Sequence, residues 1–215
     1  MKKGLLITFE GGEAGGKSTQ IKKLSDYLTK NNIDFIVSRE PGGTMIGQEI
    51  RQLLLHSKSD MSPMVEFLLF SASRVEHIEK VVKPALEDGK VVLLDRFYDS
   101  SYVYQGLAGN LKFDDIKTIT DIAVEGVKPD LTFLLDISYE QGLERKQKDE
   151  NLKNLDRIES KGKAYHDKVR NGYLKLAKIF DDRIFVVDAS KGVDEVFDQI
   201  KTKFDEVLKN QISKN

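Results

Sequence analysis

The sequence contains no cysteine and no tryptophan, and it has only four prolines in 215 residues. The absence of cysteine excludes disulfides, iron–sulfur clusters and zinc sites built from thiolates. No charge of one sign is in excess, because 34 lysines and arginines stand against 35 aspartates and glutamates. The balanced charge predicts no nucleic-acid surface.

Long hydrophobic runs are also absent. The chain begins with the basic segment Met1-Lys2-Lys3, but the apolar run Leu5–Phe9 that follows ends at Glu10. That run is too short for the hydrophobic part of a signal peptide. No run approaches the ~18–20 apolar residues of a membrane span. We therefore expect a cytoplasmic protein that does not bind a membrane.

Two kinds of segment alternate along the chain. Short apolar runs without strict alternation, typical of strands buried on both faces of a parallel sheet, are Leu5–Phe9, Phe35–Ser38, Val91–Leu94, Leu131–Leu135 and Ile184–Val187. Segments with helical periodicity are Ile21–Thr29, Ile46–Leu55, a segment opened by Ser62-Pro63 and extending towards Leu86, Asp115–Val124, Tyr139–Lys146, Lys163–Ile179 and Val193–Leu208. The alternation predicts a single α/β domain over residues 1–215, with a doubly wound five-stranded parallel sheet flanked by helices.

One segment departs from this pattern. Residues Glu144–Lys163 are almost all charged or polar, with hardly an apolar anchor. Two interpretations stay open, a solvated loop between helices and a small mobile lid over a site.

The strongest motif is a phosphate-binding loop (P-loop). It runs through Gly11, Gly12, Glu13, Ala14, Gly15, Gly16, Lys17 and Ser18, followed by Thr19, between a predicted strand and a predicted helix. Glycines allow backbone N–H groups to turn inward around a phosphate, where a Cβ would clash. Lys17 supplies a charge to the β- and γ-phosphates, and the hydroxyl of Ser18 can bind Mg²⁺. We therefore predict an ATP site over Gly11–Thr19.

Asp95 is the candidate partner of Ser18 in binding Mg²⁺, through water. It ends the run Val91–Leu94, at the edge of the sheet where doubly wound folds bind ligands. Asp136 and Asp188 end similar runs and are rivals. Arg96 distinguishes Asp95 from them, because it adds a cation where an anionic substrate would lie.

The P-loop alone does not define the reaction. A GTPase-type switch needs Asp-x-x-Gly after a strand, and no glycine in this chain follows an aspartate by three residues. The segment Thr202-Lys203-Phe204-Asp205 matches a guanine-reading motif but falls within a predicted helix. The loop also lacks the Gly-x-Gly-x-x-Gly spacing of dinucleotide enzymes. A small-molecule kinase is favoured, and a non-catalytic nucleotide-binding protein stays open.

Further blocks point to one family. They are Phe9-Glu10-Gly11, Arg39-Glu40-Pro41-Gly42-Gly43-Thr44, Asp95-Arg96, Asp99-Ser100-Ser101, Tyr104-Gln105-Gly106, Lys128-Pro129-Asp130-Leu131-Thr132 and Leu155-Asp156-Arg157-Ile158-Glu159. In this order, over nearly the whole chain, the sequence resembles the bacterial thymidylate kinases, a family of P-loop nucleoside monophosphate kinases. The resemblance implies transfer of the γ-phosphate of ATP, with Mg²⁺, to thymidine 5′-monophosphate (dTMP) for dTTP synthesis.

The resemblance also implies roles at the acceptor phosphate and sugar. Arg39 and Arg96, with Arg51 nearby, would hold the 5′-phosphate, because guanidinium groups suit phosphate. The Glu40–Pro41 turn, implied to be cis, would line the acceptor site and aim Arg39 into it. Glu13 would accept a hydrogen bond from the 3′-hydroxyl, and Tyr104 would crowd the ribose 2′ position.

For the base, the resemblance implies that Phe70 stacks on thymine and that Arg74 binds it. Phe70 and Arg74 are four residues apart on the helix predicted after Pro63, hence on one face. Ser101 and Gln105 are also four apart, and the amide of Gln105 can read a pyrimidine edge. Without the resemblance, Phe70 would be interpreted as a core residue.

Charge neutralisation at the transferred phosphate is expected from Lys17, Arg96 and the lid. Some relatives carry an arginine in the P-loop where this chain has Ala14, so the resemblance assigns the missing charge to the lid, with Arg145 as the candidate. Arg157 and the lysines Lys146, Lys148 and Lys153 are further lid cations.

The resemblance further implies a homodimer formed by the helices over Met64–Leu86 and Asp115–Val124. The three histidines, His56, His77 and His166, show no ligand spacing. We interpret them as surface or packing residues.

Overall fold

The computed structural model describes residues 4–57, 59–148 and 161–212. Across these residues, five parallel strands form one sheet in the order β2-β3-β1-β4-β5. The strands are β1 (Leu5–Glu10), β2 (Phe35–Arg39), β3 (Val91–Asp95), β4 (Leu131–Asp136) and β5 (Ile184–Asp188). The α/β class and the five-stranded parallel sheet predicted from the sequence are confirmed.

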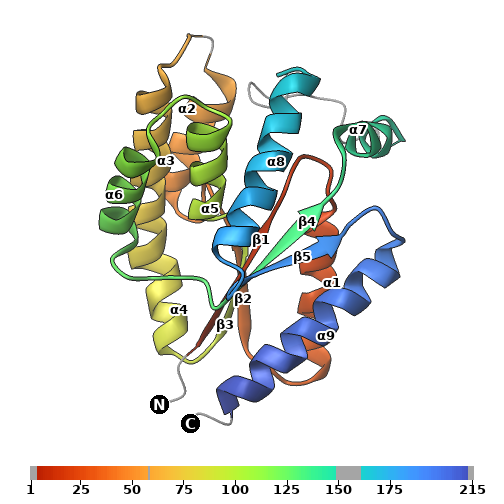
Figure 1. Ribbon diagram of the computed structural model, residues 1–215. Helices are drawn as coiled ribbons and strands as arrows, with labels where there is room; N and C mark the ends of the chain where they lie inside the picture. Colours follow the sequence, from red (N-terminus) through yellow and green to blue (C-terminus); the bar gives the residue numbers. More distant parts are fainter. Residues whose placement is uncertain (1–3, 58, 149–160, 213–215) are drawn as a thin grey trace.

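Helices cover both faces of this sheet (Figure 1). The α-helices are α1 (Lys17–Lys30), α2 (Met45–His56), α3 (Pro63–His77), α4 (Lys83–Glu87), α5 (Tyr98–Ser101), α6 (Phe113–Val124), α7 (Tyr139–Lys148), α8 (Lys163–Ile179) and α9 (Val193–Ile212). Two π-helical turns, η1 (Ile78–Val82) and η2 (Tyr102–Leu107), continue α3 and α5. Within the described ranges, no helix is long and apolar enough to cross a membrane.

Alternate residues of the strands face two separate cores. Leu5, Ile7 and Phe9 of β1 point to the face covered by α1 and α9, where Leu24 and Phe204 are fully buried. The burial of Phe204 within α9 identifies Thr202–Asp205 as part of a helix face, so this segment is not a guanine-reading loop.

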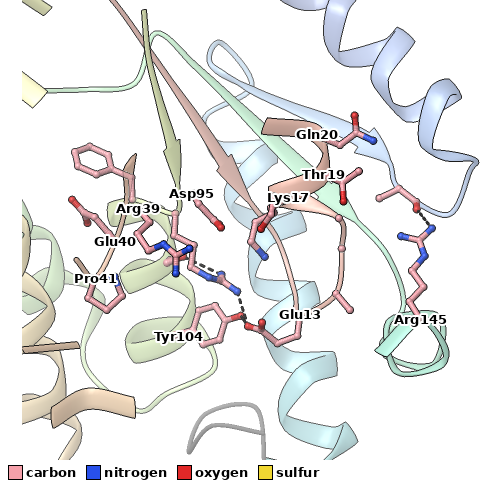
Figure 2. A pocket seen from close by; sticks show the side chains of 18 of the residues that line it. Glu13, Lys17, Thr19, Gln20, Arg39, Glu40, Pro41, Asp95, Tyr104 and Arg145 are labelled. Atoms are coloured by element: carbon pink, nitrogen blue, oxygen red, sulfur yellow. Dashed lines mark hydrogen bonds and ion pairs between the residues drawn. The ribbon is translucent and has the colours of Figure 1, made fainter. Parts of the chain in front are cut away.

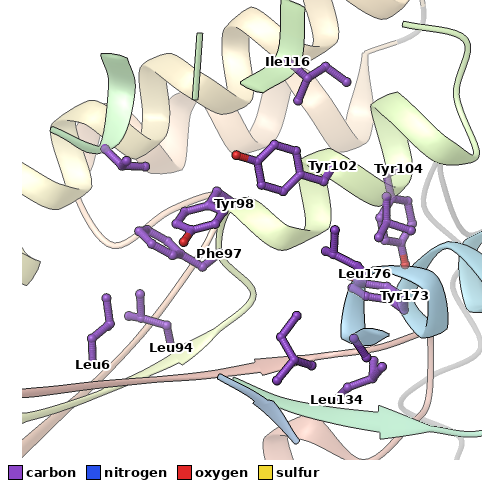
Figure 3. Close-up of a cluster of buried hydrophobic side chains, with 14 of the residues drawn as sticks. Leu6, Leu94, Phe97, Tyr98, Tyr102, Tyr104, Ile116, Leu134, Tyr173 and Leu176 are labelled. Atoms are coloured by element: carbon purple, nitrogen blue, oxygen red, sulfur yellow. The ribbon is translucent and has the colours of Figure 1, made fainter. Parts of the chain in front are cut away.

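The second core lies on the opposite face of the sheet. Leu6 of β1, Leu94 of β3 and Leu134 of β4 pack there with an aromatic cluster of Phe97, Tyr98, Tyr102, Tyr104 and Tyr173 (Figure 3). This core joins η2 and α8 to the sheet, and it continues directly into the cavity described below.

Each strand extends one residue beyond its predicted end and finishes on a charged residue. These residues are Glu10, Arg39, Asp95, Asp136 and Asp188. The prediction that every strand is buried on both faces is wrong for β2 and β5. They are the edges of the sheet: every residue of β2 is partly buried or exposed, and β5 buries only Ile184 and Val187.

Ser62 and Pro63 open α3 as predicted, with the hydroxyl of Ser62 accepting a hydrogen bond from the N–H of Val65 at 3.4 Å. The helical path continues through η1 and α4 to Glu87. No pattern in the sequence predicted α5 and η2. These short elements carry Ser101, Tyr104 and Gln105, and π-helical turns of this kind often occur at functional sites.

Candidate active site

One cavity of about 760 Å³ lies at the carboxyl edge of the sheet. Its lining includes residues of the P-loop at one end and the side chains of Arg39, Phe70, Arg74 and Gln105 at the other. Figure 2 shows Lys17 and Glu13 between Arg39 on one side and Arg145 on the other. A cavity of this size has room for a ligand of nucleotide size or larger.

The P-loop connects β1 to α1 in a conformation that needs glycine. Gly11 has φ +133°, and a Cβ there would lie 2.5 Å from the carbonyl oxygen of Leu135. Gly16, with φ +90°, precedes the first turn of α1. This loop therefore presents the N-terminal end of a helix to the cavity, an arrangement that binds phosphate.

Lys17 lies at the first position of α1, and its ammonium group is folded over the loop. Its Nζ donates hydrogen bonds to the carbonyl oxygens of Gly12, at 3.0 Å, and Gly11, at 3.4 Å. Burial, and then the nearby charge of Arg96, lower the pKa of Lys17. The cation is thus held in a desolvated position, where its charge acts strongly on a bound phosphate.

Glu13, Arg96 and Tyr104 form one connected group beside Lys17. Nη2 of Arg96 donates to Oε1 of Glu13 at 2.6 Å, and the hydroxyl of Tyr104 donates to the same oxygen at 3.2 Å (Figure 2). The guanidinium of Arg96 also lies 5.1 Å from the centre of the Tyr104 ring. Arg96 has φ +67°, an uncommon conformation for a residue with a side chain, and such strain concentrates at functional sites.

A buried network beneath Arg96 was not predicted from the sequence. Glu10 accepts hydrogen bonds from the N–H of Phe97 at 2.8 Å, the hydroxyl of Ser100 at 2.6 Å and the hydroxyl of Tyr173 at 2.8 Å. Nη1 of Arg96 donates to the Tyr173 oxygen at 3.1 Å. Burial, and then the negative charge of Asp99, raise the pKa of Glu10 to about 7. An acidic residue directly after the apolar run Leu5–Phe9 was the available sequence signal, whereas Tyr173 gave none.

Arg39 and the turn after it line the same end of the cavity. The Glu40–Pro41 peptide bond is cis, as the resemblance implied. Nη1 of Arg51 in α2 donates to the carbonyl oxygen of Pro41 at 3.1 Å. Arg51 therefore fixes the turn, and its guanidinium lines the cavity beside it.

Arg74 is almost fully buried, with 1% of its surface exposed, and is not a surface cation. Its Nε donates to Oε2 of Glu40 at 2.8 Å, and its Nη2 donates to the hydroxyl of Ser101 at 3.2 Å. The remaining nitrogen, Nη1, is buried and has no hydrogen-bond partner among the described residues. A buried charged donor without a partner is costly, and Arg74 lines the cavity.

Gln105 and Phe70 complete this end of the cavity. Nε2 of Gln105 donates to Oε1 of Glu66 at 2.8 Å, which fixes the orientation of the amide. Phe70 is partly buried against the aromatic core. Residues from α3 and η2 thus converge on one pocket, although they are distant in the sequence.

Among the candidate magnesium ligands, the surroundings favour Asp95 over its rivals. Asp136 is held by Arg170 through two hydrogen bonds of 2.7 and 2.9 Å. Asp188 accepts hydrogen bonds from the backbone and hydroxyl of Ser190. Oδ1 of Asp95, in contrast, is buried and finds no partner in the described part of the chain. Asp95 and Ser18 both line the cavity, and both can supply oxygen ligands of the kind that Mg²⁺ takes.

Arg145 of α7 lies at the far side of the P-loop (Figure 2). Its Nη2 donates to the carbonyl oxygen of Ala189 at 2.6 Å, in the loop between β5 and α9. It lines the same cavity as Lys17, as does Lys146. The central part of the predicted lid, residues 149–160, lies outside the described residues, and Arg157 and Lys153 with it.

A P-loop at the carboxyl edge of a parallel sheet, with a set of arginines facing it across one cavity, is the arrangement of a P-loop nucleotide kinase. It brings a triphosphate and a second, anionic ligand to the same place.

Comparison with known proteins defines the family. The family model described as thymidylate kinase matches residues 9–200. The chain is 44% identical to the thymidylate kinase of Thermoanaerobacter sp. (strain X514), over 92% of this chain and 96% of that one. It is 46% identical to the thymidylate kinase of Halothermothrix orenii, over 94% of this chain and 96% of that one. The crystal structure of thymidylate kinase from Ehrlichia chaffeensis superimposes with a TM-score of 0.75 and 30% identity, covering 93% of this chain and 98% of that chain. The chain belongs to the thymidylate kinase family.

Proposed function

We propose that this protein transfers the γ-phosphate of ATP to dTMP, giving ADP and thymidine 5′-diphosphate. The observation that carries the proposal is the single cavity with a P-loop at one end and Arg39, Arg74 and Gln105 at the other. An oxygen of the dTMP phosphate attacks the γ-phosphorus, and ADP leaves with the electrons of the broken bond. The reaction needs positioning and charge neutralisation more than covalent chemistry from the protein.

The phosphate of dTMP would be held by Arg39 and Arg96, with Arg51 supporting the turn beside it. Glu13 would accept a hydrogen bond from the 3′-hydroxyl of the sugar. The bonds of Arg96 and Tyr104 to Glu13 bring the phosphate-binding and sugar-binding groups within one network, which supports these roles. Burial raises the pKa of Tyr104, so its hydroxyl stays neutral and can crowd the 2′ position.

The base would lie between Phe70 and the polar groups of Arg74, Ser101 and Gln105. The partnerless Nη1 of Arg74 supports this assignment, because a carbonyl oxygen of thymine is an acceptor of the right kind for it. The amide of Gln105 is oriented by Glu66, so it can offer a fixed hydrogen-bonding edge to the pyrimidine.

Mg²⁺ would be held by Asp95 and Ser18, and the unsatisfied Oδ1 of Asp95 fits this role. When bound, the ion neutralises charge on the triphosphate. Lys17 does the same from the P-loop, where its buried position strengthens the attraction between its ammonium group and a phosphate.

The lid around residues 144–163, within a single domain of residues 1–215, stays a proposal, as does the catalytic role of Arg145. The bond from Arg145 to the Ala189 carbonyl gives a second possibility. In that case Arg145 would contribute to ATP affinity through the loop between β5 and α9 rather than to the transferred phosphate.

We also propose a homodimer formed through α3 and α6. Large apolar side chains on these two helices are exposed: Val65, Leu68, Val75 and Ile122. Exposed apolar surface of this kind is typical of a protein interface. Sedimentation of the purified protein should give twice the chain mass of 24.4 kDa, and a monomer at micromolar concentration would contradict the proposal. Consistent with a role in nucleotide metabolism, we propose that the protein acts in the cytoplasm.

The experiment that tests the function is a coupled assay of ADP formation. ATP and Mg²⁺ are supplied with dTMP, dUMP, dCMP, dGMP, dAMP or UMP, each as the only acceptor. We expect the highest kcat/KM with dTMP. Preference for another monophosphate would reassign the substrate within the same kinase class, and no turnover with any of them would indicate a nucleotide-binding protein without this activity.

A further inference from the structure

A chain of buried polar side chains lies directly behind Arg74. Nδ1 of His77 is 3.2 Å from Oε1 of Glu40, while the other carboxylate oxygen of Glu40 accepts from Nε of Arg74 at 2.8 Å. At the far end, Nε2 of His77 is 2.8 Å from the hydroxyl of Ser38. His77 has no exposed surface, which leaves only the packing role of the two roles predicted for the histidines.

The backbone around His77 leaves its ring little freedom. His77 ends α3, three residues after Arg74, and Ser38 and Glu40 belong to β2 and the turn that follows it. The turn passes so close to the ring that a Cβ on Gly43 would lie 2.3 Å from Cδ2 of His77. The N–H of Gly42 also donates to the hydroxyl of Ser73 at 3.2 Å. The ring is therefore confined between α3 and the turn.

The hydrogen bonds indicate how the protons are arranged. A carboxylate only accepts, so Nδ1 of His77 donates to Glu40. A neutral ring then accepts from the hydroxyl of Ser38 at Nε2. In this arrangement Glu40 and Arg74 form a neutral ion pair, and each oxygen of Glu40 has one partner. The carboxylate is held from behind by His77 and can turn only if that bond breaks.

Arg74 depends on this carboxylate for its orientation. The Nε bond to Glu40 and the Nη2 bond to Ser101 fix the plane of the guanidinium. The direction of Nη1 is consequently set by the hydrogen bonds of Nε and Nη2. His77 itself does not line the cavity, whereas Arg74 and Glu40 do.

We propose that His77 is a positioning residue for recognition of the pyrimidine base. It holds Glu40, and Glu40 aims Nη1 of Arg74 at a carbonyl oxygen of the base. The inference rests on the proposed function, because it assumes a pyrimidine beside Arg74. Thymine and uracil present a carbonyl oxygen where cytosine presents an amino group, so an accurately aimed donor selects against cytosine.

Two amide substitutions, each of which keeps the contact of one ring nitrogen, test the role of His77. The amide nitrogen of asparagine can occupy the place of Nδ1, so His77→Asn keeps a donor for Glu40. The end of glutamine reaches the place of Nε2, so His77→Gln keeps the contact with Ser38 and loses the donor to Glu40. Both variants remove an aromatic ring from the same site, and the loss of packing is therefore shared.

We expect His77→Gln to raise the KM for dTMP about tenfold, because a misplaced charged donor loses most of its hydrogen bond. Its preference for dTMP over dCMP, as a ratio of kcat/KM values, should fall about fivefold. The KM for ATP should stay within about twofold of the wild-type value, because the P-loop lies at the other end of the cavity. His77→Asn should stay within about twofold of the wild type in all three quantities.

If the two variants change the KM values for dTMP and ATP equally, the proposal is overturned and His77 is a packing residue. A wild-type KM for dTMP in His77→Gln would also overturn the proposal. If His77→Gln does not fold, Glu40→Gln tests the next step of the same chain, which is the aiming of Arg74 by the Glu40 carboxylate. It keeps the size of the side chain and removes its charge, and unchanged dTMP affinity and base preference would then refute the proposal. Turnover of dTMP by the wild-type protein distinguishes failure of the proposed kinase function from failure of the proposed role of His77. If the wild type does not turn over dTMP, the proposed function itself is refuted.

Discussion

The surroundings of Glu10 predict how the free energy of unfolding depends on pH. The carboxyl group ends β1, has 1% of its surface exposed and accepts three hydrogen bonds. Burial, and then Asp99, raise its pKa from an ordinary value of 4.5 to about 7. In the unfolded chain the group is exposed and has its ordinary pKa. The folded protein therefore binds a proton at Glu10 more tightly than the unfolded chain does.

The sign of the pH dependence follows from this difference. Below the unfolded pKa both states are protonated, and the contribution of Glu10 to stability is fully present. As the pH rises towards 7, the unfolded chain loses the proton first, so the free energy of unfolding falls. Above the folded pKa the loss is complete, and the change in pKa corresponds to about 3 kcal/mol in total.

Glu10→Gln removes the titration while keeping the length of the side chain. Urea unfolding at about pH 5 and about pH 8, followed by circular dichroism, measures the free energy of unfolding at each end of the window. The loss between these two pH values should be about 2 kcal/mol smaller in Glu10→Gln than in the wild type. Glu49→Gln, on the exposed surface of α2, is the control and should keep the wild-type loss. An identical loss in Glu10→Gln and the wild type would refute the assignment of a raised pKa to Glu10.

Three further predictions concern the cavity. Lys17→Met should lower kcat at least about 100-fold at unchanged thermal stability, since it removes charge at the transferred phosphate; steady-state turnover within a few-fold of the wild type would contradict the P-loop assignment. Asp95→Asn should raise the free Mg²⁺ concentration needed for half-maximal activity about tenfold, and an unchanged magnesium titration would exclude Asp95 as a ligand. Arg145→Ala should lower kcat if Arg145 reaches the transferred phosphate, with little change in melting temperature. A raised KM for ATP at unchanged kcat would instead identify the contact with the loop at Ala189 as the important one.

The sequence was sufficient for the elements with strong local signals. The glycines and Lys17 of the P-loop, the apolar runs and the Ser62-Pro63 helix start each express a local physical requirement, and the structure contains all of them. The edge position of β2 and β5 was not predictable in the same way. Their composition resembles that of the central strands, and only the order of the strands determines which of them lose a neighbour.

Residues that contact the cavity-lining side chains from behind were harder to predict from the sequence than the lining residues themselves. Arg74 and Gln105 were found by resemblance, and both line the cavity. Their partners Glu40, His77 and Glu66 could not be assigned, because contacts between β2, α3 and η2 depend on how these elements pack. The π-helical turn over Tyr102–Leu107 also has no signature in composition, although it sets the direction of Tyr104 and Gln105.

Two of the arginines at the acceptor end are each paired with a carboxylate. Arg96 pairs with Glu13 at 2.6 Å, and Arg74 pairs with Glu40 at 2.8 Å. The Arg74 pair is almost fully buried, and removing one member of such a pair leaves an uncompensated charge that costs about 3–5 kcal/mol. An exposed arginine would give only a small effect on truncation to alanine, but Arg74 is buried. Truncation of Arg74 would therefore lower stability together with dTMP affinity, and a kinetic loss alone would not measure the contact with the base. Substitutions that keep the charge balance, or that act one bond further back at His77, separate the two effects, because they leave the ion pair in place and change only where it points.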